Sequence, residues 1–129
     1  MIISATYKEL SLLACVSTGR KISIQYDSNN SFSLHTKEGV LFFSLDIDWY
    51  FTLIKVESNN LLFKVSTSGW ASKKGLKSIL GNKYGVTLVD DVLTVDIQKL
   101  RPYKYRFASL EEFAIMPDSL KFQIKIESI

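Results

Sequence analysis

The sequence predicts an α+β fold: a curved, mostly antiparallel meander sheet of about eight strands with two helices packed on it. Three observations lead to this prediction. Apolar residues alternate with polar ones over most of the chain, which is typical of strands with one buried face. Short connections rich in Asn, Asp and Ser separate these runs, as in hairpins. Two other stretches have apolar residues at three- and four-residue spacing, as in helices.

The first helix is expected over residues 4–19. Thr6 and Glu9 have the spacing of a capping box, and Gly19 is suited to end the helix. The residues expected on its buried side are Tyr7, Leu10, Leu13 and Ala14. Cys15 lies near that side and is expected to be a small core residue. As the only cysteine, it cannot form an internal disulfide.

A repeated motif predicts two hairpin turns. The segments DSNNSFSLHT (27–36) and ESNNLLFKVS (57–66) each contain an acidic residue, the tripeptide SNN and an alternating run. Because Asn tolerates a positive φ angle and bonds to nearby backbone, we expect a turn at each SNN. Residues 21–26 alternate in the same way and are expected to form the strand that enters the first turn.

The longest alternating pattern covers residues 40–57. Its odd positions are apolar, namely Leu41, Phe43, Leu45, Ile47, Trp49, Phe51 and Leu53. After Leu53 the apolar residues move to even positions, at Ile54 and Val56, which predicts a β-bulge. A straight strand of this length would reach about 59 Å at ~3.3 Å per residue, so we expect one bent strand or two consecutive strands.

The second helix is expected over residues 70–80, WASKKGLKSIL, with Ser68 as cap and Gly81 at its end. Its apolar side, with Trp70, Leu76 and Ile79, would cover the long strand. Further strands are expected after it, over residues 86–97 with a turn at DD, over residues 103–107, and over residues 113–126 with a turn at PDS.

Residues that carry catalysis are scarce. His35 is the only histidine, and it points away from Leu34 on a strand, so we expect a surface residue. The motifs CxxC, HExxH and GxSxG are absent from the sequence. Asp46 and Asp48 share one strand face, where they would either contribute to a cation site or simply face solvent. We therefore expect a protein that is not an enzyme and that holds no cofactor and no metal.

Basic residues are concentrated in two windows, residues 64–83 and 99–106, although the net charge is only +3. Such a surface attracts anions, and it also suits a solvated face kept basic for solubility. The candidate anion-binding residues are Lys73, Lys74, Lys77, Arg101, Lys104 and Arg106. Nucleic acid is a third and less favoured partner, because alternation in RPYKYRF (101–107) places rings and cations on opposite faces.

The order of elements resembles that of the tubular lipid-binding superfamily, the BPI-like proteins. The resemblance covers most of the chain and rests on WASKKGLKSIL, VTLVDDVLTVDI and FAIMPDSLKFQIKIE. It implies a helix packed in a strongly curved sheet, with an acyl chain in the groove between them. No motif matches position by position, so no functional residue is carried over.

The leading hypothesis is therefore a non-enzymatic binding module that accepts a lipid or another apolar ligand between the second helix and the sheet. The candidate ligand-binding residues are Phe43, Leu45, Ile47, Trp49, Phe51, Trp70, Leu76 and Ile79. The alternative is a protein–protein interaction subunit or adaptor, or a homo-oligomer, that uses a sheet edge.

The ends and the hydropathy of the chain give two further expectations. The beginning, MIISATYKEL, lacks the pattern of a signal peptide, which favours the cytoplasm. No transmembrane segment is expected, and the chain as a whole is expected to form a single domain, residues 1–129.

Overall fold

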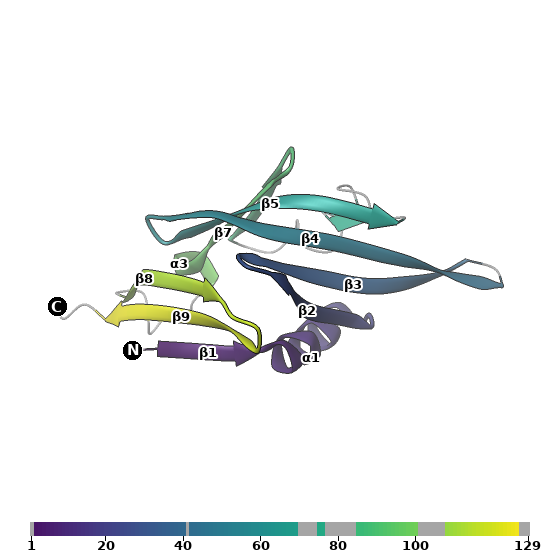
Figure 1. The fold of residues 1–129 in the computed structure, drawn as a ribbon, viewed down its shortest axis with the longest axis horizontal. Helices are drawn as coiled ribbons and strands as arrows, with labels where there is room; N and C mark the ends of the chain where they lie inside the picture. The colour runs from purple at the N-terminus through teal and green to yellow at the C-terminus, as the bar shows by residue number, and fades with distance from the viewer. Residues whose placement is uncertain (1, 41, 70–74, 77–84, 101–107, 127–129) are drawn as a thin grey trace.

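The computed structural model describes all residues except 1, 41, 70–74, 77–84, 101–107 and 127–129 (Figure 1). The described residues form two antiparallel sheets of three and six strands. In spatial order, the smaller sheet contains β1 (Ile2–Thr6), β9 (Ser119–Ile126) and β8 (Ala108–Ile115). The larger contains β2 (Ile22–Ser28), β3 (Ser31–Val40), β4 (Phe43–Glu57), β5 (Asn60–Gly69), β7 (Val92–Asp96) and β6 (Val86–Val89). The helices are α1 (Tyr7–Thr18) and the one-turn α3 (Ile97–Leu100).

The predicted α+β class, with about eight strands in one meander sheet and two helices, is wrong. The described chain is mostly β, with nine strands in two sheets and a single helix longer than one turn. Local alternation identifies strands but not their partners, and β1 pairs with β9 from the other end of the chain. The expected helix over residues 70–80 lies outside the described residues, except Gly75 and Leu76, which are helical.

The first helix begins later than expected. Residues 4–6, predicted to be helical, belong to β1, where Ser4 pairs with Lys121. The predicted cap is confirmed, since Thr6 accepts a hydrogen bond from the Glu9 backbone and the Glu9 side chain accepts one from Thr6. The predicted end is confirmed as well, because Gly19 adopts the left-handed conformation with a φ angle of 69°.

The predicted SNN and DD turns are confirmed. Positive φ angles occur at Asn30 (61°) in the first SNN turn, and at Ser58 (48°) and Asn59 (71°) in the second. Asp90 has a φ angle of 55° in the turn between β6 and β7. Asn and Asp tolerate this region because their short side chains bond to local backbone, so turn chemistry in the sequence identified these hairpins.

The long strand is confirmed in part. β4 is one strand of 15 residues, and its pairing with β5 shifts between Leu53 and Lys55, where the bulge was predicted. The pattern over residues 40–57 is not a single strand, however. Val40 belongs to β3 and pairs with Phe43 across a hairpin turn. Four apolar residues in a row concealed this turn, because turns are normally polar.

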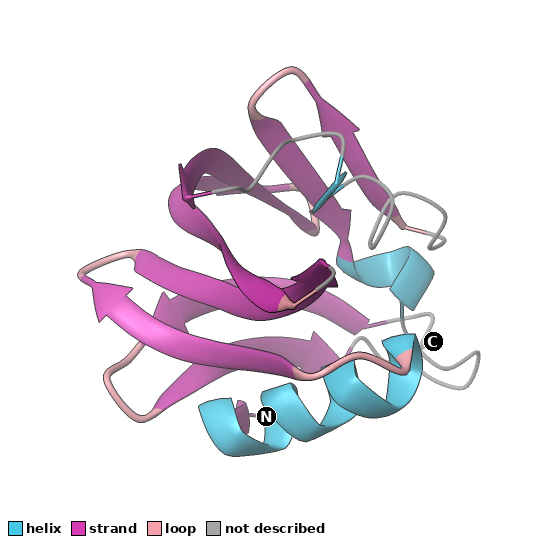
Figure 2. Ribbon diagram, turned by 90° about the vertical axis from the view of Figure 1, so that its right-hand side faces the viewer, coloured by secondary structure: helices cyan, strands magenta, loops and turns pink. Residues whose placement is uncertain are grey.

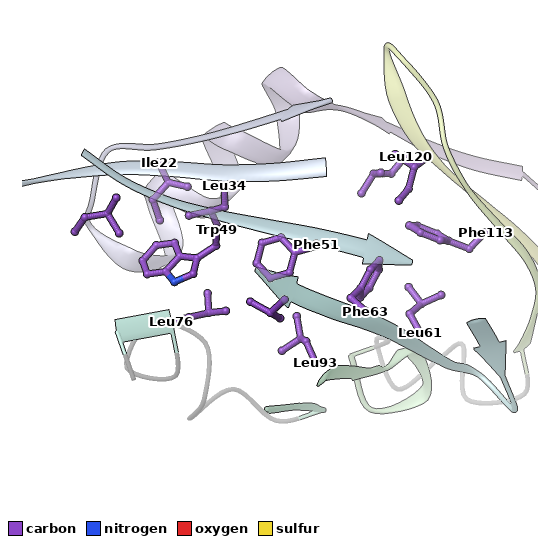
Figure 3. Packing of buried hydrophobic residues seen from close by; sticks show 13 residues of the cluster. Ile22, Leu34, Trp49, Phe51, Leu61, Phe63, Leu76, Leu93, Phe113 and Leu120 are labelled. Atoms are coloured by element: carbon purple, nitrogen blue, oxygen red, sulfur yellow. The ribbon is translucent and has the colours of Figure 1, made fainter. Parts of the chain in front are cut away.

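Aromatic rings connect the two sheets into one core (Figure 3). Trp49 and Phe51 on β4 are each 2% exposed, and Leu76 is completely buried. Phe63 on β5 packs edge to face against Phe113 on β8, with ring centroids 5.9 Å apart. The prediction that alternate residues of the long strand face the core is therefore confirmed in the middle of β4.

Helix α1 covers the outer edge of β2 (Figures 1 and 2). The backbone N–H of Ile24 donates to Ser11 Oγ at 2.8 Å, and the N–H of Ile22 points to Cys15 Sγ at 3.2 Å. Ser11 and Cys15 are four residues apart, so they lie on one face of the helix. This face gives hydrogen-bond partners to an edge that would otherwise be open.

One tyrosine ties α1 to the smaller sheet. The Tyr7 hydroxyl donates a hydrogen bond to the backbone carbonyl of Met116, with an oxygen–oxygen distance of 2.6 Å. Burial is the main cause that raises the pKa of Tyr7 above its usual value of 10.0, and the neighbouring Tyr26 and Asp118 raise it further. The protonated phenol is thus the form that the folded protein favours.

Removing the central indole is expected to be costly. Trp49→Ala should lower the free energy of unfolding by about 3–5 kcal/mol, because a cavity replaces a side chain that is almost fully buried. Urea denaturation followed by circular dichroism measures this loss. Ile54→Ala, on the same strand but 50% exposed, should lower it by roughly 0.5 kcal/mol or less. Similar losses for both variants would contradict this description of the core.

Alkaline pH should weaken the folded state through Tyr7. Since its folded pKa is raised, its contribution to stability is fully present below pH 10, the ordinary value, and is lost as the pH rises through the folded value. The Tyr7→Phe variant should therefore lose less stability than the wild type between neutral and strongly alkaline pH. Parallel slopes for wild type and Tyr7→Phe would contradict the assignment.

Candidate functional site

The residues predicted to hold an apolar ligand lie largely in the packed core. Ile47, Trp49, Phe51 and Leu76 are buried, and Figure 3 shows Leu76 next to Trp49. Leu45 is half-buried on β4. The described part of the structure does not include Trp70, Ile79 or the side chain of Phe43. A groove was expected between the second helix and the sheet, but the described side chains at this place belong to one buried cluster. The lipid hypothesis stays a prediction.

The predicted anion-binding residues cannot be placed. All six lie outside the described residues, namely Lys73, Lys74, Lys77, Arg101, Lys104 and Arg106. Nucleic-acid binding through the windows 64–83 and 99–106 likewise stays a prediction.

The polar face of the larger sheet brings together three residues that the sequence did not connect. His35 on β3 pairs in register with Asp48 on β4, and the His35 Nδ1 atom lies 2.5 Å from Asp48 Oδ1. The His35 Nε2 atom lies 2.7 Å from Ser33 Oγ. His35 does point away from Leu34 as predicted, but its side chain is only 28% exposed. Both ring nitrogens therefore have fixed partners.

The order Ser33–His35–Asp48 is that of a proton relay, in which a carboxylate orients an imidazole and the imidazole contacts a hydroxyl. Nucleophilic attack, however, requires that the hydroxyl reach a substrate. Ser33 is only 3% exposed, and its Oγ atom lies 3.4 Å from the Gln25 carbonyl oxygen, which it can use as an acceptor. The cluster is thus suited to joining β2, β3 and β4 through polar contacts rather than to covalent catalysis.

An open pocket of about 580 Å³ adjoins this cluster. The residues that line it are Cys15, Lys21, Ile22, Ser23, His35, Thr36, Lys37, Asp46 and Asp48. Its two carboxylates are both engaged, since Asp48 contacts His35 and Asp46 Oδ1 lies 3.8 Å from Lys37 Nζ. Across the described part of the chain, no group of three His, Cys, Asp or Glu side chains is placed to hold a metal ion. Asp46 faces solvent, whereas the Asp48 side chain is only 24% exposed and is held against His35.

The sheet edges differ in how they are protected. The edge of β2 is covered by α1, and β6 is the shortest strand and is followed directly by Asp90 and Asp91. The edge strand β8 carries the exposed Glu111 and Glu112 beside a bulge. Short length, charge and bulges all discourage pairing with another chain.

The edge strand β1 has neither charge nor a bulge, and with five residues it is one residue longer than β6. Its sequence, IISAT, contains no charged residue and no proline, and its register with β9 is uninterrupted. Ile2 is 69% exposed and Ile3 is 44% exposed. On the described residues, β1 is therefore a neutral edge that is open to another strand.

The outer side of α1 is also apolar. Leu12 is 58%, Leu13 63% and Val16 84% exposed. The expectation that Leu13 lies on the buried side is wrong, because α1 covers the edge of β2 rather than a sheet face, and Cys15 occupies that side instead. A helix that is apolar on both sides is typical of one with contacts on both sides.

No protein-family model, no curated protein and no solved structure matches this chain. Within the described residues, no helix has both the length and the apolar character that are needed to cross a membrane.

The relay gives a direct comparison of two aspartates on the same strand face. Asp48→Ala should lower the free energy of unfolding by about 1–2 kcal/mol, because it leaves the half-buried His35 without one hydrogen-bond partner. Asp46→Ala is the matched control and should cost about 0.5 kcal/mol or less, since that side chain is 73% exposed. Chemical denaturation at neutral pH measures both, and equal costs would show that the relay adds nothing to stability.

Proposed function

We propose that this chain is a non-enzymatic protein-interaction module that pairs with a second copy of itself along the open edge of β1. The observation that carries the proposal is the contrast between β1 and the other described edges. Those edges are covered, short or charged, whereas β1 presents a neutral strand with exposed Ile2 and Ile3. An unprotected edge of this kind offers backbone N–H and C=O groups to another strand.

Antiparallel pairing of β1 with its copy would join two three-stranded sheets into one sheet of twice the width. A two-fold axis brings each residue of an edge opposite the same edge of the other copy, so a charged edge would repel itself. The neutral β1 carries no such repulsion. Its lack of charge also gives no electrostatic preference for a different partner, which favours self-pairing.

The apolar side of α1 supports the same contact. A stable protein interface buries about 800 Å² on each partner, which is more than one short strand can supply. Helix α1 follows β1 directly, and both lie along the lower side of the molecule in Figure 1. Leu12, Leu13 and Val16 can therefore add apolar area next to the paired strands.

Sedimentation equilibrium over a concentration series tests this function. The wild type should show a mass that rises toward that of a dimer. Ser4→Lys, at the centre of β1, should weaken dimerisation by more than about tenfold, because a two-fold pair brings the two new lysines close together. Val89→Lys has the same net charge and changes a residue that is 63% exposed on β6, so it should leave dimerisation unchanged.

Two results would contradict the proposal. One is a wild-type protein that keeps the monomer mass at every concentration. The other is an equal loss of dimer in both lysine variants, which would trace the effect to net charge. Circular dichroism of each variant shows whether the fold is retained.

A further inference from the structure

A two-stranded arm extends beyond the rest of the larger sheet (Figure 1). The pairing of β2 with β3 ends at Thr36, and the pairing of β5 with β4 ends at Ile47. Between these points, residues 37–46 of β3 and β4 pair only with each other among the described residues. Among the described residues, neither edge of this arm therefore has a strand partner beyond these points.

The turn at the end of this arm is apolar in sequence, unlike the other hairpin turns of the chain. The other hairpin turns contain Asn, Asp or Ser, which suit tight turns and face water. Here the last ladder pair is Val40 with Phe43, and the turn contains Phe42. Phe42 is 100% exposed, more than any other large apolar residue in the described chain. An apolar residue held entirely in water at a protruding tip points to a contact that buries it.

We propose that this arm is a membrane-contact element, which inserts Phe42 at its tip into the interfacial region of a zwitterionic lipid bilayer. Aromatic side chains favour this region, where an apolar ring leaves water while polar groups nearby stay hydrated. The arm suits a shallow contact of this kind. Its unpaired backbone groups cannot enter the hydrocarbon layer, so insertion stops near the turn.

Charge near the tip favours a neutral bilayer over an anionic one. Lys37 and Asp46 face each other across the arm with 3.8 Å between Nζ and Oδ1, so their charges offset each other. Both side chains are more than 70% exposed and can remain in water behind the inserted tip. The sequence adds one acidic residue, Glu38, and no further cation between these two positions. The arm therefore offers no positive surface for anionic headgroups.

A bilayer also fits the size of the tip better than a protein partner does. A protein complex needs roughly 800 Å² of matched surface on each side, which a single hairpin turn does not provide. A bilayer needs no complementary shape, and it surrounds a narrow tip on every side. The tip and β1 lie at opposite ends of the molecule in Figure 1, so this contact is independent of self-association.

Flotation with vesicles of pure phosphatidylcholine tests the contact. The full chain is mixed with vesicles at several lipid concentrations, and the bound fraction gives a partition coefficient. Neutral vesicles are chosen because the basic windows of the chain then contribute nothing. Phe42→Ser should lower the coefficient by about tenfold or more, since moving a phenylalanine ring out of water changes an equilibrium by at least that factor.

Val89→Ser is the matched control, because Val89 is also exposed and also lies beside a hairpin turn. Wild-type binding that persists in Val89→Ser and is lost in Phe42→Ser supports the proposal. Absence of wild-type binding to phosphatidylcholine overturns it. Binding that requires phosphatidylserine, falls with salt and survives Phe42→Ser also overturns it, because charge would then be the attraction.

Discussion

Two open sheets must satisfy or protect the backbone groups along their edges, and this need determines how the elements around them are used. Every open sheet leaves two rows of N–H and C=O groups without a strand partner. In the larger sheet, Ser11 and Cys15 of α1 contact one such row on β2. A helix that is used to cover an edge keeps its other side in water, which explains why α1 has no fully buried residue and still carries exposed leucines.

The aromatic core imposes a second requirement, because it must hold together two sheets whose described strands do not pair with each other. Side chains contribute to this link in two ways. Phe63 packs edge to face against Phe113, and the side-chain oxygen of Asn59 accepts a hydrogen bond from the Leu110 backbone at 2.6 Å. Asn59 thus serves twice, once as a turn residue with a positive φ angle and once as a bridge to the smaller sheet. The turn between β4 and β5 therefore also contributes to the contact between the two sheets.

Local structure was readable from the sequence, whereas long-range pairing was not. The capping box, the SNN turns and the bulge after Leu53 each follow from the chemistry of a few neighbouring residues, and each is confirmed. The pairing of β1 with β9 depends on residues more than a hundred positions apart, for which a single sequence gives no signal. The contact between His35 and Asp48 was missed for a related reason. Its register requires a turn near Phe42, and the apolar residues there resembled a continuous strand.

That same apolar turn shows how a departure from local rules can indicate function. Polar residues could form the same turn without shortening either strand, and no aromatic ring would then be fully exposed. The requirements of folding therefore do not explain Phe42. The neutral β1 poses the same question at another surface, since one lysine would protect its edge. Natural sequences agree with local preferences nearly everywhere, and their exceptions concentrate where a surface has a use. The exceptions in this chain lie on its surface, at the end of an arm and along an edge, whereas the polar relay on the sheet has all its partners within the protein.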